Sequence, residues 1–287
     1  MEIIKSIQKI VNSTPDGIWG PKTQAAVASA LGCKNDVKSI QALVGTTVDG
    51  ILGPKSYAAI LAKLQGCQQK PVSGGYDLFL DPGHTADFTR EHPSQFADGI
   101  WNSGKPAEVA KILGFTSKTN DSLEHMLNVS ICESIKEEAE KLGLKVYMYD
   151  NPCQSNNCEI TTVYTKVNEI KPKHFVSIHN NACGTSGWKT LCCKASGTVG
   201  LYKDGRSNGR ELATKLSKAL IALRKSTGGP HNRADCVTTS NVAVLCKTSA
   251  SIPTTLIEVG FYDNIEDLHW ITTHLKEIGK TIAAELA

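Results

Sequence analysis

Two imidazoles and two carboxylates stand at wide intervals along the chain, each at the end of a predicted buried element: His84, Glu124, His179 and Glu258. Two histidines and one glutamate are a known ligand set for hydrolytic zinc, in which the fourth coordination position is left for water. A second glutamate outside the ligand set can move protons. The four residues therefore predict a catalytic metal site, and the chain is expected to be a metallohydrolase.

Each of these residues also has a structural interpretation. His84 follows Asp-Pro-Gly and could belong to a turn. Glu124 stands three residues after Asp121, which is the spacing of a helix capping box. His179 ends an apolar run and could be a hydrogen-bonded core imidazole. Glu258 is the hardest to explain structurally, because a carboxylate inside a buried strand is costly unless a cation or a polarised water molecule compensates it.

A regular alternation of strand and helix signals after residue 75 predicts an α/β domain, with a mostly parallel sheet covered by helices. The expected strands span 77–81, 145–149, 174–178, 198–202 and 254–259, and the expected helices span 122–142, 160–170, 207–226 and 264–286. Ligands of such sheets bind beyond the carboxyl ends of the strands. His84, His179 and Glu258 lie at or just after such ends, so three strands would bring them to one rim.

The first part of the chain contains an internal repeat with an offset of 33 residues, in which Asp-Gly-Ile-Trp-Gly-Pro-Lys at 16–22 returns as Asp-Gly-Ile-Leu-Gly-Pro-Lys at 49–55. Each copy predicts a helix, a glycine-rich turn and a second helix that begins at proline, which is favoured at the first helical position. One copy is too small to hold a core, so the two copies are expected to form a small all-α domain over 1–67. Residues 68–75 are expected to be a linker before a catalytic domain over 76–287.

The composition is that of an ordinary globular protein, with 40% hydrophobic and 21% charged residues. The formal net charge of +3 resides in residues 1–67, which hold seven lysines and four acidic residues. This mild basicity lacks the arginine clusters and interleaved aromatic residues of nucleic-acid binders, so no nucleic-acid partner is expected. No apolar run approaches membrane-spanning length, so no membrane insertion is expected.

The N-terminal residues and the cysteines indicate in which cellular compartment the protein is made. Lys5 and Lys9 interrupt the first apolar pattern, which does not match a Sec signal peptide, so synthesis and initial residence in the cytoplasm are expected. A cytosolic chain usually keeps its cysteines reduced or uses some of them for metal. Two pairs could hold a structural zinc or form a disulfide after export, Cys153 with Cys158 and the vicinal Cys192 with Cys193, although free thiols are the favoured state.

The order of the four motifs resembles that of the zinc-dependent N-acetylmuramoyl-L-alanine amidases of the amidase_3 type. These motifs are Asp-Pro-Gly-His, Glu-x-x-x-Asn at the head of a helix, Ser-Ile-His-Asn-Asn-Ala, and Ile-Glu-Val-Gly-Phe-Tyr-Asp-Asn. The resemblance spans residues 76–287 and implies that His84, Glu124 and His179 bind one Zn²⁺. It also implies that Glu258 is the catalytic carboxylate, and that the bond cut joins the muramoyl lactyl group to L-alanine.

Two features depart from that family. The segment between His84 and Glu124 is longer than the family often has, which suggests a cap or substrate-facing insertion over 85–123 that carries Trp101. The arginine that is common before the third motif is absent from residues 161–168. One structural or substrate contact of the family is therefore not expected here.

Four further residues stand close to the motifs. Asn180, Asn181 and His231 could line the site, but a role outside the ligand set or in a turn is expected for them. His125, next to a predicted ligand, is expected to point away from the ligand face and to lie at the surface.

The sequence Asp-Gly-x-x-Gly-Pro-Lys-Thr/Ser resembles the peptidoglycan-binding repeat of many cell-wall hydrolases, so residues 1–67 are expected to bind peptidoglycan. A binding repeat, an amidase domain and synthesis without a signal peptide together resemble a bacteriophage endolysin, made in the host cytoplasm and acting on the cell wall after release. Peptidoglycan is the expected partner of this monomeric enzyme. A bacterial autolysin, a zinc peptidase acting on stem-peptide cross-links and a wall-binding protein without activity remain open alternatives.

Overall fold

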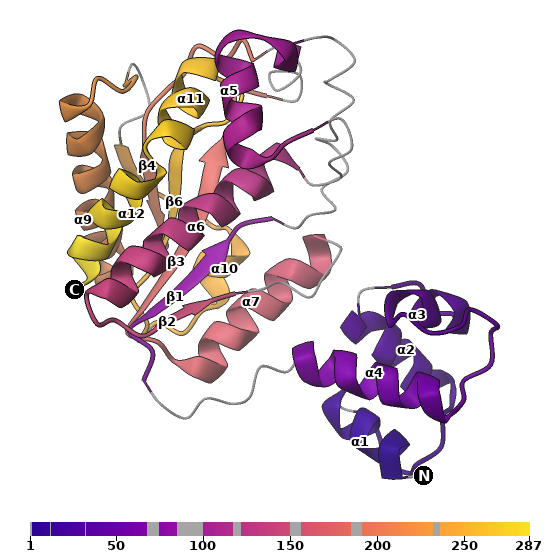
Figure 1. Cartoon of the computed structure of the whole chain (residues 1–287). Helices are drawn as coiled ribbons and strands as arrows, with labels where there is room; N and C mark the ends of the chain where they lie inside the picture. Colours follow the sequence, from indigo (N-terminus) through magenta and orange to yellow (C-terminus); the bar gives the residue numbers. More distant parts are fainter. Residues whose placement is uncertain are drawn as a thin grey trace. The chain divides into compact units, whose positions relative to one another are not determined.

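The computed structural model describes residues 2–11, 13–31, 33–67, 75–84, 100–116, 122–149, 156–184, 191–231 and 236–287 (Figure 1). The chain divides into two compact units. One contains Met1–Ser73 and Asn151–Glu159, and the other contains Gly74–Asp150 and Ile160–Ala287. None of the helices in these described stretches is long and apolar enough to cross a membrane.

The repeat forms four helices, in agreement with the expected all-α region. They are α1 (Glu2–Ile10), α2 (Pro21–Leu31), α3 (Val37–Leu43) and α4 (Pro54–Cys67). Both α2 and α4 begin at the proline of the repeat motif. One apolar cluster joins the helices of both copies, with Ile7, Val27, Leu31, Ile40, Ile60 and Leu64 at its centre. The two copies therefore share one core, as their small size requires.

A buried glutamine holds the glycine turn of each copy. In the first copy, the Nε2 atom of Gln8 donates to Asp16 Oδ1 at 2.7 Å and to the Ile18 carbonyl at 2.9 Å. Its Oε1 atom accepts from the Gly17 amide at 2.8 Å. Gln41 makes the same three contacts in the second copy, at 2.8, 2.9 and 2.8 Å. Gly17 has a φ of 81°, so glycine is required at this turn.

A six-stranded sheet forms the centre of the second unit, in the order β2-β1-β3-β6-β4-β5 (Figure 1). The strands are β1 (Leu78–Pro82), β2 (Val146–Met148), β3 (His174–Asn181), β4 (Val199–Tyr202), β5 (Cys236–Thr239) and β6 (Thr254–Phe261). Neighbouring strands are parallel, except that β4 and β6 are antiparallel. The predicted α/β class with a mostly parallel sheet is confirmed.

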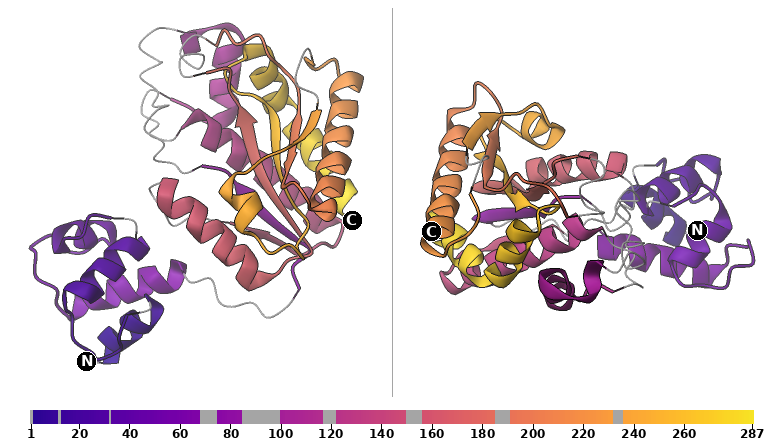
Figure 2. Two further views of the ribbon diagram at one scale, coloured as in Figure 1. Left: turned by 180° about the vertical axis from the view of Figure 1, so that it is seen from behind. Right: turned by 90° about the horizontal axis from the view of Figure 1, so that it is seen from above.

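Helices cover both faces of this sheet (Figure 2). One face carries α6 (Leu123–Lys141), α9 (Ser207–Ser226), α11 (Ile265–Thr273) and α12 (Leu275–Leu286). The other carries α7 (Asn156–Ile170) and α10 (Ala243–Lys247). Leu78 and Leu80 belong to the core of the first face and Phe79 to that of the second, because successive side chains of a strand point to opposite faces.

The predicted single helix over 264–286 is wrong, because α11 ends at Thr273 and α12 begins at Leu275. Thr272 and Thr273 are β-branched residues, whose side chains are restricted in a helix. The Thr273 hydroxyl also donates to the His269 carbonyl at 2.7 Å, a side-chain bond that competes with the helical ladder. The chain therefore turns between two shorter helices.

The described part of the insertion over 85–123 consists of η3 (Ile100–Asn102) and α5 (Gly104–Leu113). The Trp101 side chain is 3% exposed, and its ring centroid lies 5.2 Å from that of Phe115. Trp101 is therefore a core residue of the insertion, and the proposed role of the insertion as a cap or substrate-facing segment stays a prediction. The remaining residues of the insertion, 85–99 and 117–121, lie outside the described residues.

Candidate metal centre

The end of β1, the end of β3 and the first turn of α6 meet at one rim of the sheet. His84 follows β1, His179 lies in β3 and Glu124 is the second residue of α6. One ligand atom from each of these three side chains lies within 4.8 Å of the other two. The structure thus brings together the three residues that the sequence predicted as metal ligands.

The Glu124 carboxylate lies between the two imidazoles. Its Oε2 atom is 3.2 Å from His84 Nε2, and its Oε1 atom is 3.4 Å from His179 Nδ1. Burial by itself would raise the pKa of Glu124, but the two imidazoles lower that pKa to about 2. Two imidazole nitrogens and an ionised carboxylate oxygen are donors that suit Zn²⁺.

The start of α6 explains why Glu124 reaches this position. Ser122 is the N-cap, and its side chain accepts from the His125 amide at 3.1 Å. The Glu124 carboxylate instead accepts from the backbone amide of Asn180 at 3.2 Å, while facing the imidazoles. The capping-box interpretation of Glu124 is therefore wrong, because a different residue caps the helix.

The turn before the first histidine is tightly constrained. His84 has a φ of 66°, a left-handed conformation that is uncommon outside glycine and is found where the surroundings enforce it. A Cβ atom on Gly83 would lie 2.0 Å from His179 Nε2. The Gly83 carbonyl accepts from Asn128 Nδ2 at 2.8 Å, and Asn180 Nδ2 donates to Asn128 Oδ1 at 2.8 Å. This amide chain fixes the turn against both α6 and β3.

Glu258 lies in β6, in register with His179 of the adjacent β3. Residues that are opposite each other in neighbouring strands present their side chains on the same face. The Oε2 atom of Glu258 is buried, and no described residue hydrogen-bonds to it. Burial, together with the charge of Glu124, raises the pKa of Glu258 to about 7, against the opposing effect of the imidazoles. An unsatisfied buried carboxylate oxygen with a raised pKa is typical of a group that carries a proton.

The remaining residues expected near the site fall into two groups. Asn180 contacts Glu124 as described, and Asn181 Oδ1 accepts locally from the Ala182 amide at 2.8 Å, so both residues make structural hydrogen bonds beside the His-Glu-His group. His231 is exposed, and its Nδ1 atom lies 2.9 Å from the Gly229 carbonyl within a turn. His125 is half-buried, with its Nδ1 atom 3.3 Å from the Gly83 carbonyl. The expectation that His125 is a surface residue is wrong, because its ring turns back toward the site.

Two polar residues that support the centre, Asn128 and Asp81, stand in the sequence motifs, but sequence reasoning gave them no role. Asn128, one helical turn after Glu124, joins the Gly83 turn to β3, as described above. Asp81 is buried in β1, and its Oδ2 atom accepts from Ser177 Oγ at 2.7 Å. Burial raises the pKa of Asp81, against the hydrogen bond from Ser177. The available signal was a carboxylate inside an apolar strand, as for Glu258.

A disulfide fastens the segment that follows β3. Cys183 is bonded to Cys193, so the favoured expectation of free thiols is wrong for these two residues, and Cys193 does not pair with Cys192. The Cys183 amide donates to Asp263 Oδ2 at 2.8 Å, and the Cys193 amide donates to the Asp263 carbonyl at 3.1 Å. The bridge thus joins the two ends of the segment between Cys183 and Cys193, and the hydrogen bonds to Asp263 hold both ends against the turn after β6. Of the other expected pair, Cys153 and the side chain of Cys158 lie outside the described residues.

Comparison with known proteins identifies the second unit. Residues 78–287 match the family model Amidase_3, N-acetylmuramoyl-L-alanine amidase. The chain belongs to this family. No curated protein sequence matches it. The sequence-based resemblance is therefore confirmed for residues 78–287, which make up most of the chain.

Solved amidase structures share the fold. An N-acetylmuramoyl-L-alanine amidase from Clostridium difficile 630 has a TM-score of 0.51 and 20% identity, over 74% of this chain and 95% of that chain. AmiC2 of Nostoc punctiforme has a TM-score of 0.51 and 18% identity, over 74% and 97%. Cwp6 from Clostridium difficile has a TM-score of 0.53 and 19% identity, over 74% and 29%. The α/β unit therefore has the fold of these N-acetylmuramoyl-L-alanine amidases.

Proposed function

We propose that this amidase uses one Zn²⁺, held by His84, Glu124 and His179, to hydrolyse the amide bond between the N-acetylmuramoyl group and L-alanine of peptidoglycan. The observation that supports the proposal is an ionised Glu124 between two imidazoles, with the unsatisfied Glu258 carboxylate on the neighbouring strand. Zinc bound there would polarise the scissile carbonyl and lower the pKa of the attacking water molecule.

Glu258 is the proton carrier in this proposal. Its Oε2 atom accepts a proton from the attacking water molecule and then donates this proton to the L-alanine nitrogen. The bond between the muramoyl carbonyl and this nitrogen breaks, and L-alanine leaves with a neutral amino group. In the metal-free chain, burial raises the pKa of this carboxyl group to about 7, and a carboxyl group positioned beside the attacking water molecule can act first as base and then as acid. Glu124 stays ionised throughout, because its pKa of about 2 lies far below neutral pH.

The experiment is Glu258→Gln in the full chain. We expect unchanged zinc content and a turnover lower by about 10² to 10⁴, the usual contribution of a positioned proton carrier. The assay counts new L-alanine α-amino groups released from sacculi, and mass spectrometry of the products shows whether the glycan strand has parted from L-alanine. Glu277→Gln, at an exposed position of α12, is the matched control. Near-wild-type turnover in Glu258→Gln would remove this residue from the mechanism, and products still joined to L-alanine would indicate a peptidase instead.

The zinc ligands have their own test. His84→Ala removes one of three donors, so we expect elemental analysis to show less than one zinc per chain. Full zinc content in this variant would contradict the assignment of His84 as a ligand.

We also propose that residues 1–67 bind peptidoglycan. The support is the repeated turn, which exposes an apolar side chain at the same place in each copy: Ile18 is 67% exposed and Ile51 is 73% exposed. The hydrogen bonds of Gln8 and Gln41 hold the two turns rigidly, so little conformational entropy is lost when the turns bind a ligand.

The pairing of such repeats with an amidase supports the further proposal of a phage endolysin, made in the host cytoplasm. Cells that produce the chain alone are then expected to stay intact until their inner membrane is permeabilised, and to lyse afterwards. Turbidity of the culture measures both stages. Lysis before permeabilisation would contradict cytoplasmic retention.

A further inference from the structure

A β-bulge follows Glu258 in β6. The ladder between β3 and β6 pairs His179 with Glu258 and then Asn181 with Phe261, so β6 has one more residue than β3 over this interval. The ladder between β4 and β6 stops at the pair of Val199 and Glu258. Bulges near active sites re-aim a neighbouring side chain, and their backbone groups need partners from outside the ladder.

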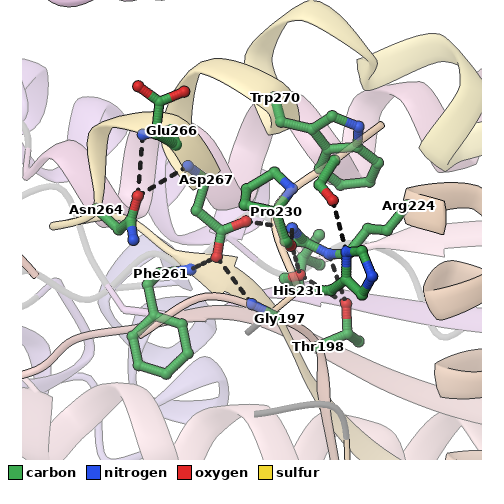
Figure 3. Close-up of polar contacts among 12 residues, drawn as sticks. Gly197, Thr198, Arg224, Pro230, His231, Phe261, Asn264, Glu266, Asp267 and Trp270 are labelled. Atoms are coloured by element: carbon green, nitrogen blue, oxygen red, sulfur yellow. Dashed lines mark hydrogen bonds and ion pairs between the residues drawn. The ribbon is translucent and has the colours of Figure 1, made fainter. Parts of the chain in front are cut away.

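A buried ion pair supplies those partners. Arg224 of α9 is 0% exposed, and its Nη2 atom donates to the Val259 carbonyl at 2.6 Å. Its Nη1 atom forms an ion pair with Asp267 of α11. Asp267 Oδ2 in turn accepts from the Phe261 amide at 2.8 Å and from the Gly197 amide at 3.1 Å. Figure 3 shows Asp267 between these amides and Arg224.

The guanidinium is fixed on every side. Its central carbon lies 4.2 Å from the ring centroid of Trp270, and its Nε atom donates to Thr198 Oγ1 at 3.2 Å. The Thr198 hydroxyl itself donates to the Val259 carbonyl at 2.9 Å. A Cβ atom on Gly260 would lie 2.5 Å from Nη2 of Arg224, so only glycine lets the bulge approach this closely.

We propose that Arg224 and Asp267 are positioning residues for Glu258. Together they hold the carbonyl of Val259 and the amide of Phe261, and thereby fix the bulge that directs the Glu258 carboxylate toward the metal centre. A buried ion pair contributes little stability compared with an apolar pair of similar volume, so stability alone does not explain why it stands beside this bulge. The inference depends on the proposed role of Glu258.

The test is Arg224→Lys in the full-length enzyme. A lysine keeps the positive charge for Asp267 but lacks the planar fork that reaches Asp267 and Val259 together. We expect one zinc per chain, a kcat lower by about 10- to 100-fold and a KM changed by less than about two-fold, because misplaced reacting groups slow the chemical step. Leu220→Ala is the matched control, one turn earlier on α9 and fully buried. It lowers the melting temperature but leaves kcat at 25 °C near the wild-type value.

A double-mutant cycle with Glu258→Gln then separates positioning from general damage. If Arg224 acts through Glu258, adding Arg224→Lys to Glu258→Gln leaves kcat unchanged. An equal loss of kcat in both backgrounds, or a loss in Leu220→Ala as large as that in Arg224→Lys, would overturn the inference. A Glu258→Gln enzyme with wild-type kcat would instead refute the proposed function, so the two failures are distinguishable.

Discussion

At the scale of single residues, Gly83 leaves no room for a side chain beside the imidazole of His179. A Cβ atom on Gly83 would lie 2.0 Å from His179 Nε2, and the other nitrogen of that ring faces Glu124. We expect Gly83→Ala to push the ring away from Glu124, so that zinc content and amidase activity fall together while the fold persists. Elemental analysis and circular dichroism measure these outcomes. Gly75→Ala, with no atom within 4 Å of the new Cβ, is the control. Full zinc binding by Gly83→Ala would show that the turn can shift to make room for the added Cβ atom.

Glu258 should also make the metal-free protein sensitive to pH. Its pKa is about 7 in the folded chain, against a usual value of 4.5. The folded state holds the Glu258 proton more tightly than the unfolded state does. The contribution of this proton to the free energy of unfolding is therefore fully present below pH 4.5 and is lost as the pH rises through about 7. The loss is about 3 kcal/mol.

We therefore expect Glu258→Gln in EDTA to melt at a higher temperature than the wild type at pH 8, with a gap that shrinks toward pH 5. Thermal unfolding of both proteins at both pH values measures the difference in melting temperature. The effects of the other ionisable groups cancel in this difference, because both proteins contain them. A gap of equal size at the two pH values would contradict the raised pKa.

At the scale of elements, the Cys183–Cys193 bridge closes a short loop in the connection from β3 to β4. In the chain-entropy model, a loop of this length contributes about 3 kcal/mol. We expect the variant that combines Cys183→Ser with Cys193→Ser to melt several degrees below the wild type. Dithiothreitol should lower the melting temperature of the wild type but not of this variant. Cys236→Ser, at an exposed position, is the control. Identical melting of the reduced and oxidised wild type would show that the loop is held by its other contacts.

The sequence predicted the long strands β3 and β6 and the helices α6 and α9 well, because apolar runs such as Phe175 to Ile178 carry their own signal, but it joined α11 and α12 into one helix. It missed β5, which has no buried residue, and α10, which is only five residues long. The four candidate site residues could be singled out because their chemical types and their places at element ends coincide. Arg224 could not, because a basic residue in the last turn of a helix is the ordinary partner of the helix dipole, and its burial depends on α11 and β6.

At the scale of the whole molecule, the two exposed isoleucines of the repeat should determine how much of the enzyme binds to peptidoglycan. We expect the variant that combines Ile18→Ser with Ile51→Ser to sediment less with purified sacculi, because both turns lose apolar contact area. Its activity on a soluble muramoyl-peptide should stay at the wild-type value. Ile112→Ser, at a 45% exposed position of α5, is the control. Unchanged sedimentation would mean that these turns do not contact the wall.

The order of the strands in the sheet determines when the sheet can be completed during synthesis. β6 is the last strand to be synthesised, yet it lies between β3 and β4, and β4 and β5 reach the rest of the sheet only through it. A ribosome that has passed residue 179 but not residue 254 has made the three proposed ligands His84, Glu124 and His179, but neither Glu258 nor the strand that completes the sheet. Translation that stops before residue 258 releases a fragment without Glu258, and we expect such a fragment to lack amidase activity.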